Sequence, residues 1–170
     1  MTFSLDFDFC QQLAAAMVLI PLTLFTQSAG MAGLILWSRA YFARNTGRLG
    51  LRHCAEIVVR VTSAMILLHF IEIVLWTVFY RWKCLPALEP AFYFSATSFS
   101  TVGYGDVVLP PFWRFLGPVE SVTGVLMCGL SASLLFALVT RLVGHEDRFL
   151  LPSPKQVAQL TVAAQHGAAS

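Results

Sequence analysis

Residues 101–106 read Thr-Val-Gly-Tyr-Gly-Asp, and they are the stretch whose residue types and spacing suit ion chemistry. Gly103 and Gly105 are of the residue type that reaches positive φ without a steric penalty. At alternate positions they allow successive peptide planes to turn so that the carbonyl oxygens face the same way. The hydroxyl of Thr101 adds one more neutral oxygen at the end of this row. A row of uncharged oxygens suits a weakly hydrated monovalent cation, whereas divalent ions take carboxylate-rich sites.

Three further segments must position this loop. Apolar segments precede it at residues 57–80 and follow it at 115–141, and residues 90–100 between them predict a short helix. Glu89-Pro90 favours a helix start, because Pro suits the first turn and an acid complements the positive end of the helix dipole. The short helix cannot span a bilayer, so we expect a re-entrant helix surrounded by protein. Outside such a context, the same string would be an ordinary surface turn.

In this context the string resembles the selectivity filter of potassium channels. The resemblance covers residues 57–141, which look like the helix–pore loop–helix unit of two-helix potassium channels. It implies that the carbonyl oxygens of Thr101, Val102, Gly103 and Tyr104 bind K⁺, with Gly105 completing the filter. The chain has one filter string and no internal repeat, so the resemblance implies a homotetramer. K⁺ is then the permeant ion, and no cofactor is implied.

The resemblance also assigns supporting roles around the filter. The ring of Tyr104 is expected to lie among pore-helix aromatics, and Asp106 is expected at the outer mouth. Some potassium channels have a glutamate behind the filter, where this sequence has Thr97, and a tryptophan that bonds to the aspartate, where it has Tyr93. The Tyr93 hydroxyl is able to make that bond. The expected supporting residues are Tyr93, Phe94, Thr97, Ser100 and Asp106.

The segment 115–141 contains two glycines, Gly124 and Gly129, that match hinge glycines of the family. Close packing against a neighbouring helix is the alternative role for both. The family pattern places a row of residues with a spacing of three or four along the inner cavity, on one helix face. Within this row, Phe136 is a candidate hydrophobic constriction. The candidate cavity residues are Val125, Cys128, Ala132, Phe136 and Thr140.

The composition is that of a membrane protein. Of 170 residues, 57% are hydrophobic and only 12% are charged, against about a quarter charged in soluble domains. Residues 12–37 carry no charge and predict an additional membrane helix, because a signal peptide would need a basic start and a shorter apolar run. The residues therefore predict an all-α membrane protein with three transmembrane helices, a re-entrant pore helix and an extended filter, and the resemblance implies that it assembles as a tetramer.

The charges predict the orientation of the chain. Residues 1–11 form an expected outer tail without Lys or Arg, and residues 38–56 form an expected cytoplasmic loop rich in arginine. Basic residues mark the cytoplasmic side of a membrane protein. With three spans, the N-terminus lies outside and the expected tail 142–170 lies in the cytoplasm. We therefore predict a multi-pass protein of the cell membrane.

Two titratable residues, His69 and Glu72, fall near the middle of the segment 57–80. An unpaired charge there costs roughly 2.5–3.5 kcal/mol on insertion scales. Their spacing places both on one helix face, which should point into protein rather than lipid. A static polar pair that fixes helix packing is one interpretation. The other is a proton-sensitive element, because histidine changes charge near neutral pH.

Other functional classes find little support in the sequence. The cysteines, Cys10, Cys54, Cys84 and Cys128, show no metal-ligand spacing, and no nucleophile–base pair is visible, so an enzyme is not expected. The expected partners are further copies of the chain and membrane lipid, with no nucleic acid and no small-molecule substrate. The predicted function is passive, potassium-selective conduction. The alternative is a non-conducting modulatory subunit or a K⁺-occupied sensor.

Overall fold

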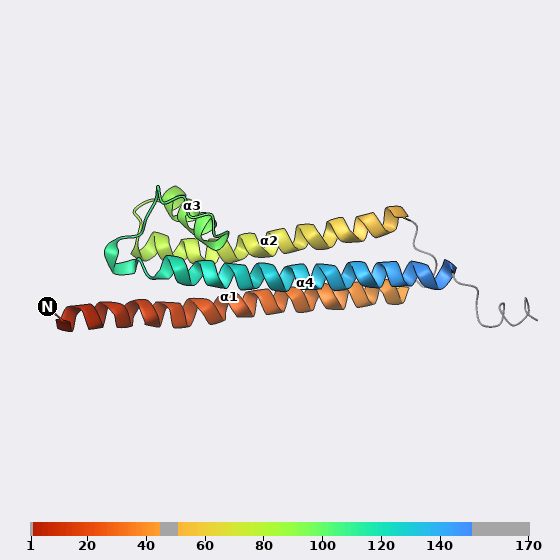
Figure 1. Cartoon of the computed structure of the whole chain (residues 1–170), viewed down its shortest axis with the longest axis horizontal. Coiled ribbons are helices and arrows are strands. Elements are labelled where there is room, and N and C mark those ends of the chain that lie inside the picture. Colours follow the sequence, from red (N-terminus) through yellow and green to blue (C-terminus); the bar gives the residue numbers. More distant parts are fainter. Residues whose placement is uncertain (1, 45–50, 151–170) are drawn as a thin grey trace, which may run out of the picture.

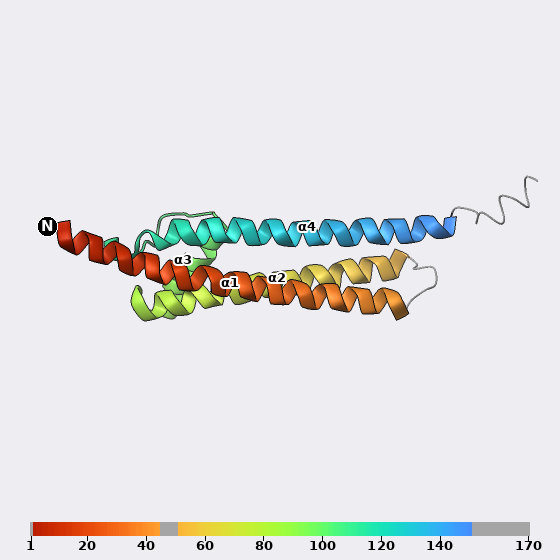
Figure 2. The ribbon, with the colours of Figure 1, turned by 90° about the horizontal axis from the view of Figure 1, so that it is seen from below.

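The computed structural model describes residues 2–44 and 51–150, and the side chains of residues 9–44 and 52–144. These residues form four α-helices and one short 3₁₀ helix: α1 (Thr2–Arg44), α2 (Leu51–Lys83), α3 (Leu88–Phe99), η1 (Pro111–Trp113) and α4 (Leu116–Leu150). Figure 1 shows α1, α2 and α4 as long helices along one direction, with the short α3 packed at one end of the bundle. The perpendicular view in Figure 2 shows α3 between α2 and α4.

Three stretches are long and apolar enough to cross a membrane: Phe9–Arg44, Arg52–Lys83 and Pro111–Gly144. Each coincides with one of the long helices, so the chain is a multi-pass membrane protein with three spans. The predicted all-α fold with three spans and a short pore-like helix is confirmed. The short helix α3 covers Leu88–Phe99, close to the expected 90–100.

The long helices extend beyond their predicted apolar segments. Much of the expected outer tail and the first part of the expected basic loop are helical, because α1 runs from Thr2 to Arg44. Similarly, α2 begins at Leu51 and α4 continues to Leu150. Hydropathy locates only the part of a helix that lipid covers, whereas Arg, Ala and Leu continue a helix readily into water. Residues 45–50 and 151–170 of the expected loop and tail lie outside the described residues.

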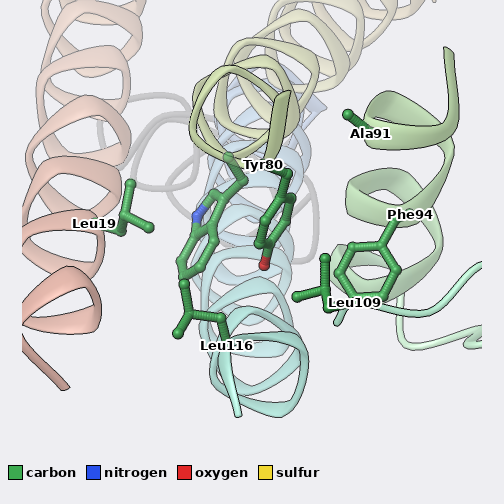
Figure 3. Close-up of a cluster of buried hydrophobic side chains, with 7 residues drawn as sticks. Leu19, Tyr80, Ala91, Phe94, Leu109 and Leu116 are labelled. Atoms are coloured by element: carbon green, nitrogen blue, oxygen red, sulfur yellow. The ribbon is translucent and has the colours of Figure 1, made fainter. Parts of the chain in front are cut away.

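An aromatic cluster holds α3 against α2 and α4 at one end of the bundle. The rings of Tyr80 and Phe94 meet edge to face, with centroids 5.1 Å apart, a favoured aromatic geometry. Figure 3 shows this contact, with Leu19 reaching toward it from α1. The buried members of the cluster are Leu19, Trp76, Tyr80, Ala91, Phe94, Leu109 and Leu116. A second cluster, toward the other end, joins Phe42, Ile57, Val61, Met65, Leu138 and Leu142.

Buried polar contacts attach the additional helix α1 to the other two long helices. Trp76 Nε1 donates to Thr23 Oγ1 at 3.0 Å, and both side chains are fully buried. Gln27 Nε2 donates to the carbonyl of Met127 at 3.2 Å and to Ser131 Oγ at 2.9 Å. Lipid provides no hydrophobic drive for helices to associate, so such hydrogen bonds and close packing hold them together. Through them α1 is bonded to both α2 and α4.

Candidate functional site: the filter loop and its supports

The filter backbone alternates in conformation along residues 101–105. The φ angles of Thr101, Gly103 and Gly105 are 62°, 52° and 79°. The glycines adopt this region freely, whereas a residue with a side chain does so at a cost of about 1–2 kcal/mol. Positive φ at every second residue is the geometry that lets successive carbonyls turn to one side. The sequence predicted it for the glycines but not for Thr101, because the residue type itself opposes it.

The last turn of α3 anchors the start of the filter. The backbone N–H of Thr101 donates to the carbonyl of Ser98 at 2.9 Å, and that of Gly103 donates to the carbonyl of Thr97 at 3.1 Å. The Ser100 hydroxyl donates to the carbonyl of Ala96 at 2.7 Å. The filter backbone is therefore tied directly to the carboxyl end of the short helix. That end carries the negative pole of the helix dipole, which favours a cation.

Asp106 is held by hydrogen bonds at the end of the filter. The Tyr93 hydroxyl donates to Asp106 Oδ2 at 2.8 Å, and the backbone N–H of Val107 donates to Oδ1 at 3.0 Å. The hydrogen bond from Tyr93 lowers the pKa of Asp106, and the same bond raises the pKa of Tyr93. By contrast, the Thr97 hydroxyl donates to carbonyls of its own helix. Tyr93 is thus the pore-helix side chain that bonds to the aspartate.

The expected packing of the Tyr104 ring among pore-helix aromatics remains a prediction. Phe94 is buried against Tyr80, and Tyr104 remains 72% exposed in the single chain. Among the side chains that the structure describes, no ring pairs with Tyr104.

A stripe of α4 packs along α3 and consists of Gly117, Glu120, Ser121 and Gly124. A Cβ atom on Gly117 would come within 3.1 Å of the Phe94 ring, and one on Gly124 would overlap the carbonyl oxygen of Phe99. Gly124 is therefore a site of close backbone approach, as the packing alternative proposed. No atom lies within 4 Å of a Cβ placed on Gly129, and its hinge role remains a prediction.

Glu120 of α4 is a fully buried acid that was not among the residues predicted from the sequence. Its Oε2 accepts a hydrogen bond from the Tyr80 hydroxyl at 2.8 Å, and its Oε1 accepts one from Ser95 Oγ at 2.6 Å. The carboxylate therefore joins α2, α3 and α4. An acid inside an apolar span was the signal available in the sequence, because such residues are rare and usually partnered.

His69 and Glu72 form the predicted pair. His69 Nδ1 lies 3.0 Å from Glu72 Oε2, and Glu72 is fully buried. The imidazole also packs against the ring of Phe99 at the end of α3, with centroids 5.9 Å apart. The pair thus faces protein beside the base of the filter. These contacts account for a static packing role, and a proton-sensitive role remains a prediction.

The candidate cavity residues share one exposure pattern. Val125, Cys128, Ala132, Phe136 and Thr140 are all exposed in the single chain. Their neighbours on α4 that face α1 and α2, such as Met127 and Leu138, are buried. The predicted row therefore lies on the part of α4 that its own chain leaves uncovered. Other residues of α4 are exposed too, so a pore-lining role for this row remains a prediction.

The fold and this loop define a multi-pass membrane protein with a short pore-like helix between two of its spans. Residues 64–141 match the protein family described as "Ion channel". The matched stretch contains most of α2, all of α3, the loop 101–106 and most of α4. The matching family is one of channels and not of enzymes. No curated protein and no solved structure matches the chain significantly.

Proposed function

We propose that the chain is a potassium-selective channel whose pore is built from four copies. The observation that carries this proposal is the alternation of positive φ at Thr101, Gly103 and Gly105 within an ion channel domain. Such a backbone can direct a row of neutral carbonyl oxygens at one ion path. Carbonyl rows of this kind replace the hydration shell of K⁺.

Selectivity is proposed to arise from oxygens that carry no formal charge. Carbonyls of Thr101, Val102, Gly103 and Tyr104 are the expected K⁺ ligands, and the Thr101 hydroxyl closes the inner end. Asp106 lies beyond them, bonded to Tyr93. A weakly hydrated K⁺ exchanges its water for such oxygens more readily than Na⁺ does.

Assembly into a tetramer would supply the missing strands of the filter. In a single chain, Val102 and Tyr104 are 51% and 72% exposed. Below the loop, an apolar hollow of about 250 Å³ opens to the surface, lined by Thr101, Ser121, Val122, Val125 and Leu126. Exposed apolar surface beside the filter is what a neighbouring copy around a central axis would cover.

The proposed orientation places the filter entrance and the N-terminus outside the cell. The start of α1 and the short α3 lie at the same end of the bundle (Figure 1). Arg39, Arg44, Arg52 and Arg60 lie at the opposite ends of α1 and α2, the side expected in the cytoplasm. Phe136, 74% exposed in the single chain, is the proposed constriction on that side of the filter.

Ion flux through the purified protein in liposomes tests this function. We expect uptake of K⁺ and Rb⁺ far above that of Na⁺. Gly103→Asp should weaken this preference, because it places a charged side chain at a residue with φ of 52°. Equal K⁺ and Na⁺ flux through the unmodified protein would overturn the proposed selectivity. Thermal stabilisation by K⁺ without any flux would instead favour the K⁺-occupied sensor.

A further inference from the structure

Glu120 lies where α2, α3 and α4 meet, and none of its carboxylate is exposed. Both hydroxyls that it accepts from, those of Tyr80 and Ser95, belong to fully buried residues on different helices. Ser95 Oγ is also 3.0 Å from the carbonyl of Ile73 on α2. A buried carboxylate with such short hydrogen bonds is costly unless the bonds are kept. The arrangement therefore fixes the height and the rotation of α3 relative to α2 and α4.

Glu120 is the centre of the α4 stripe that follows the pore helix. Gly124 brings the backbones of α3 and α4 close at one end of the stripe, and Gly117 leaves room for the Phe94 ring at the other. Between them Ser121 Oγ donates to the carbonyl of Ser98 at 2.7 Å. Glycines alone permit close approach but allow sliding, whereas the carboxylate of Glu120 defines one register between the helices.

This register is transmitted to the filter through one peptide group. The carbonyl of Ser98 accepts from Ser121 Oγ on α4 and from the backbone N–H of Thr101 at 2.9 Å. One turn earlier on the same helix, Ser95 is bonded to Glu120. A displacement of α3 relative to α4 would thus move the first oxygen of the filter.

We propose that Glu120 is a positioning residue for the ion filter, acting through Ser95 and the last turn of α3. This inference rests on the proposed function, because its effect is on ion preference. With an apolar residue at position 120, the pore helix keeps its aromatic packing but loses the register that aligns the filter oxygens. The filter then discriminates less well between K⁺ and Na⁺.

The test measures the ratio of K⁺ to Na⁺ permeability, in liposomes, for Glu120→Leu and Glu120→Gln. We expect Glu120→Leu to lower the ratio about tenfold, equivalent to about 1.4 kcal/mol. Glu120→Gln should stay near the parent, because the amide oxygen can accept from Tyr80 while the amide N–H₂ donates to Ser95 Oγ, whose hydroxyl then donates to the Ile73 carbonyl. The control is Thr123→Val, which removes a buried hydroxyl of α4 that bonds only to Val119 of its own helix. A purely structural role would reduce the amount of folded protein without changing the ratio.

A second pair of variants guards against failure of Glu120→Leu to fold. Tyr80→Phe combined with Ser95→Ala removes both donors and should lower the ratio in the same direction. An unchanged ratio in folded protein lacking the acceptor or both donors would overturn the inference while leaving the proposed function intact. Absence of potassium preference in the unmodified protein would overturn the proposed function, and this inference with it.

Discussion

The Tyr93 hydroxyl and Asp106 Oδ2 are 2.8 Å apart, joining the pore helix to the residue that follows the filter. The bond spans the loop, so the two ends of the candidate filter are tied to the same helix: the first end through Ser98 and the far end through Tyr93. A loop closed at both ends loses fewer conformations when it adopts its strained backbone. The bond also makes the far end of the loop depend on the charge of Asp106.

The first prediction concerns acid. Because the bond from Tyr93 lowers the pKa of Asp106, Asp106 is ionised and bonded to Tyr93 at every pH above the ordinary aspartate pKa of about 4. This ionised form is lost only as the pH falls through the lowered pKa of Asp106. Tyr93→Phe removes the donor, raises the pKa of Asp106 toward its ordinary value and should move the acid-induced loss of Rb⁺ flux to higher pH. External pH between about 3 and 6 is the range to measure.

Asp106→Asn is the control for this prediction, because it removes the titrating group. Any remaining acid dependence in that variant arises elsewhere. If Tyr93→Phe and the parent lose flux at the same external pH, the proposed link between the bond and the outer mouth is wrong.

The second prediction compares two glycines of α4. Gly124→Ala should destabilise the protein by about 1–3 kcal/mol or more, because the new methyl group would overlap the carbonyl of Phe99. Gly129→Ala should be neutral or stabilising by about 0.5–1 kcal/mol, because nothing lies within 4 Å of the added Cβ. Thermal unfolding of both variants in detergent measures the difference, and equal midpoints would contradict the close approach at Gly124.

The third prediction concerns the attachment of α1. Thr23→Val leaves the buried Trp76 indole N–H without its acceptor, which should cost about 1–3 kcal/mol. Thr26→Val is the matched control, because Thr26 is only half-buried and its hydroxyl bonds only to Leu22 of the same helix. Thr23→Val should therefore have a lower unfolding midpoint than Thr26→Val. A Thr23 variant as stable as the Thr26 variant would show that the hydrogen bond contributes nothing to helix association.

The fourth prediction concerns orientation. In a variant retaining only Cys10, which is exposed, a membrane-impermeant thiol reagent should label intact cells. A variant whose only cysteine is Arg44→Cys, at the exposed end of α1, should be labelled only after the membrane is permeabilised. The reverse pattern would invert the proposed topology.

Cys54 and Cys84 are less suitable as reporters of orientation. Cys54 is half-buried beside the cluster that contains Phe42. Burial raises the pKa of the Cys84 thiol to about 12, so the reactive thiolate is scarce at neutral pH. Slow labelling at either position would therefore report the environment of the thiol and not its side of the membrane.

Local information in the sequence determined the filter string, the three spans and the short helix before the filter. Hydropathy is summed along the chain, so it locates spans without knowledge of their neighbours. The spacing of Gly103 and Gly105 likewise predicts backbone freedom from residue type alone. Tyr93 and Asp106 are 13 residues apart, and the resemblance to potassium channels suggested that they pair.

The tertiary structure decided what depends on the register between helices. Nothing local separates Gly124 from Gly129, yet only Gly124 meets the backbone of α3. Likewise, the sequence shows Glu120 only as an acid in an apolar run, whereas packing brings it the hydroxyls of Tyr80 and Ser95. Thr101 adopts positive φ against the preference of its residue type, and the hydrogen bond to Ser98 helps hold it there. Such features depend on which helix faces meet and at what height along the helices. Residues that are distant along the chain decide both the facing and the height.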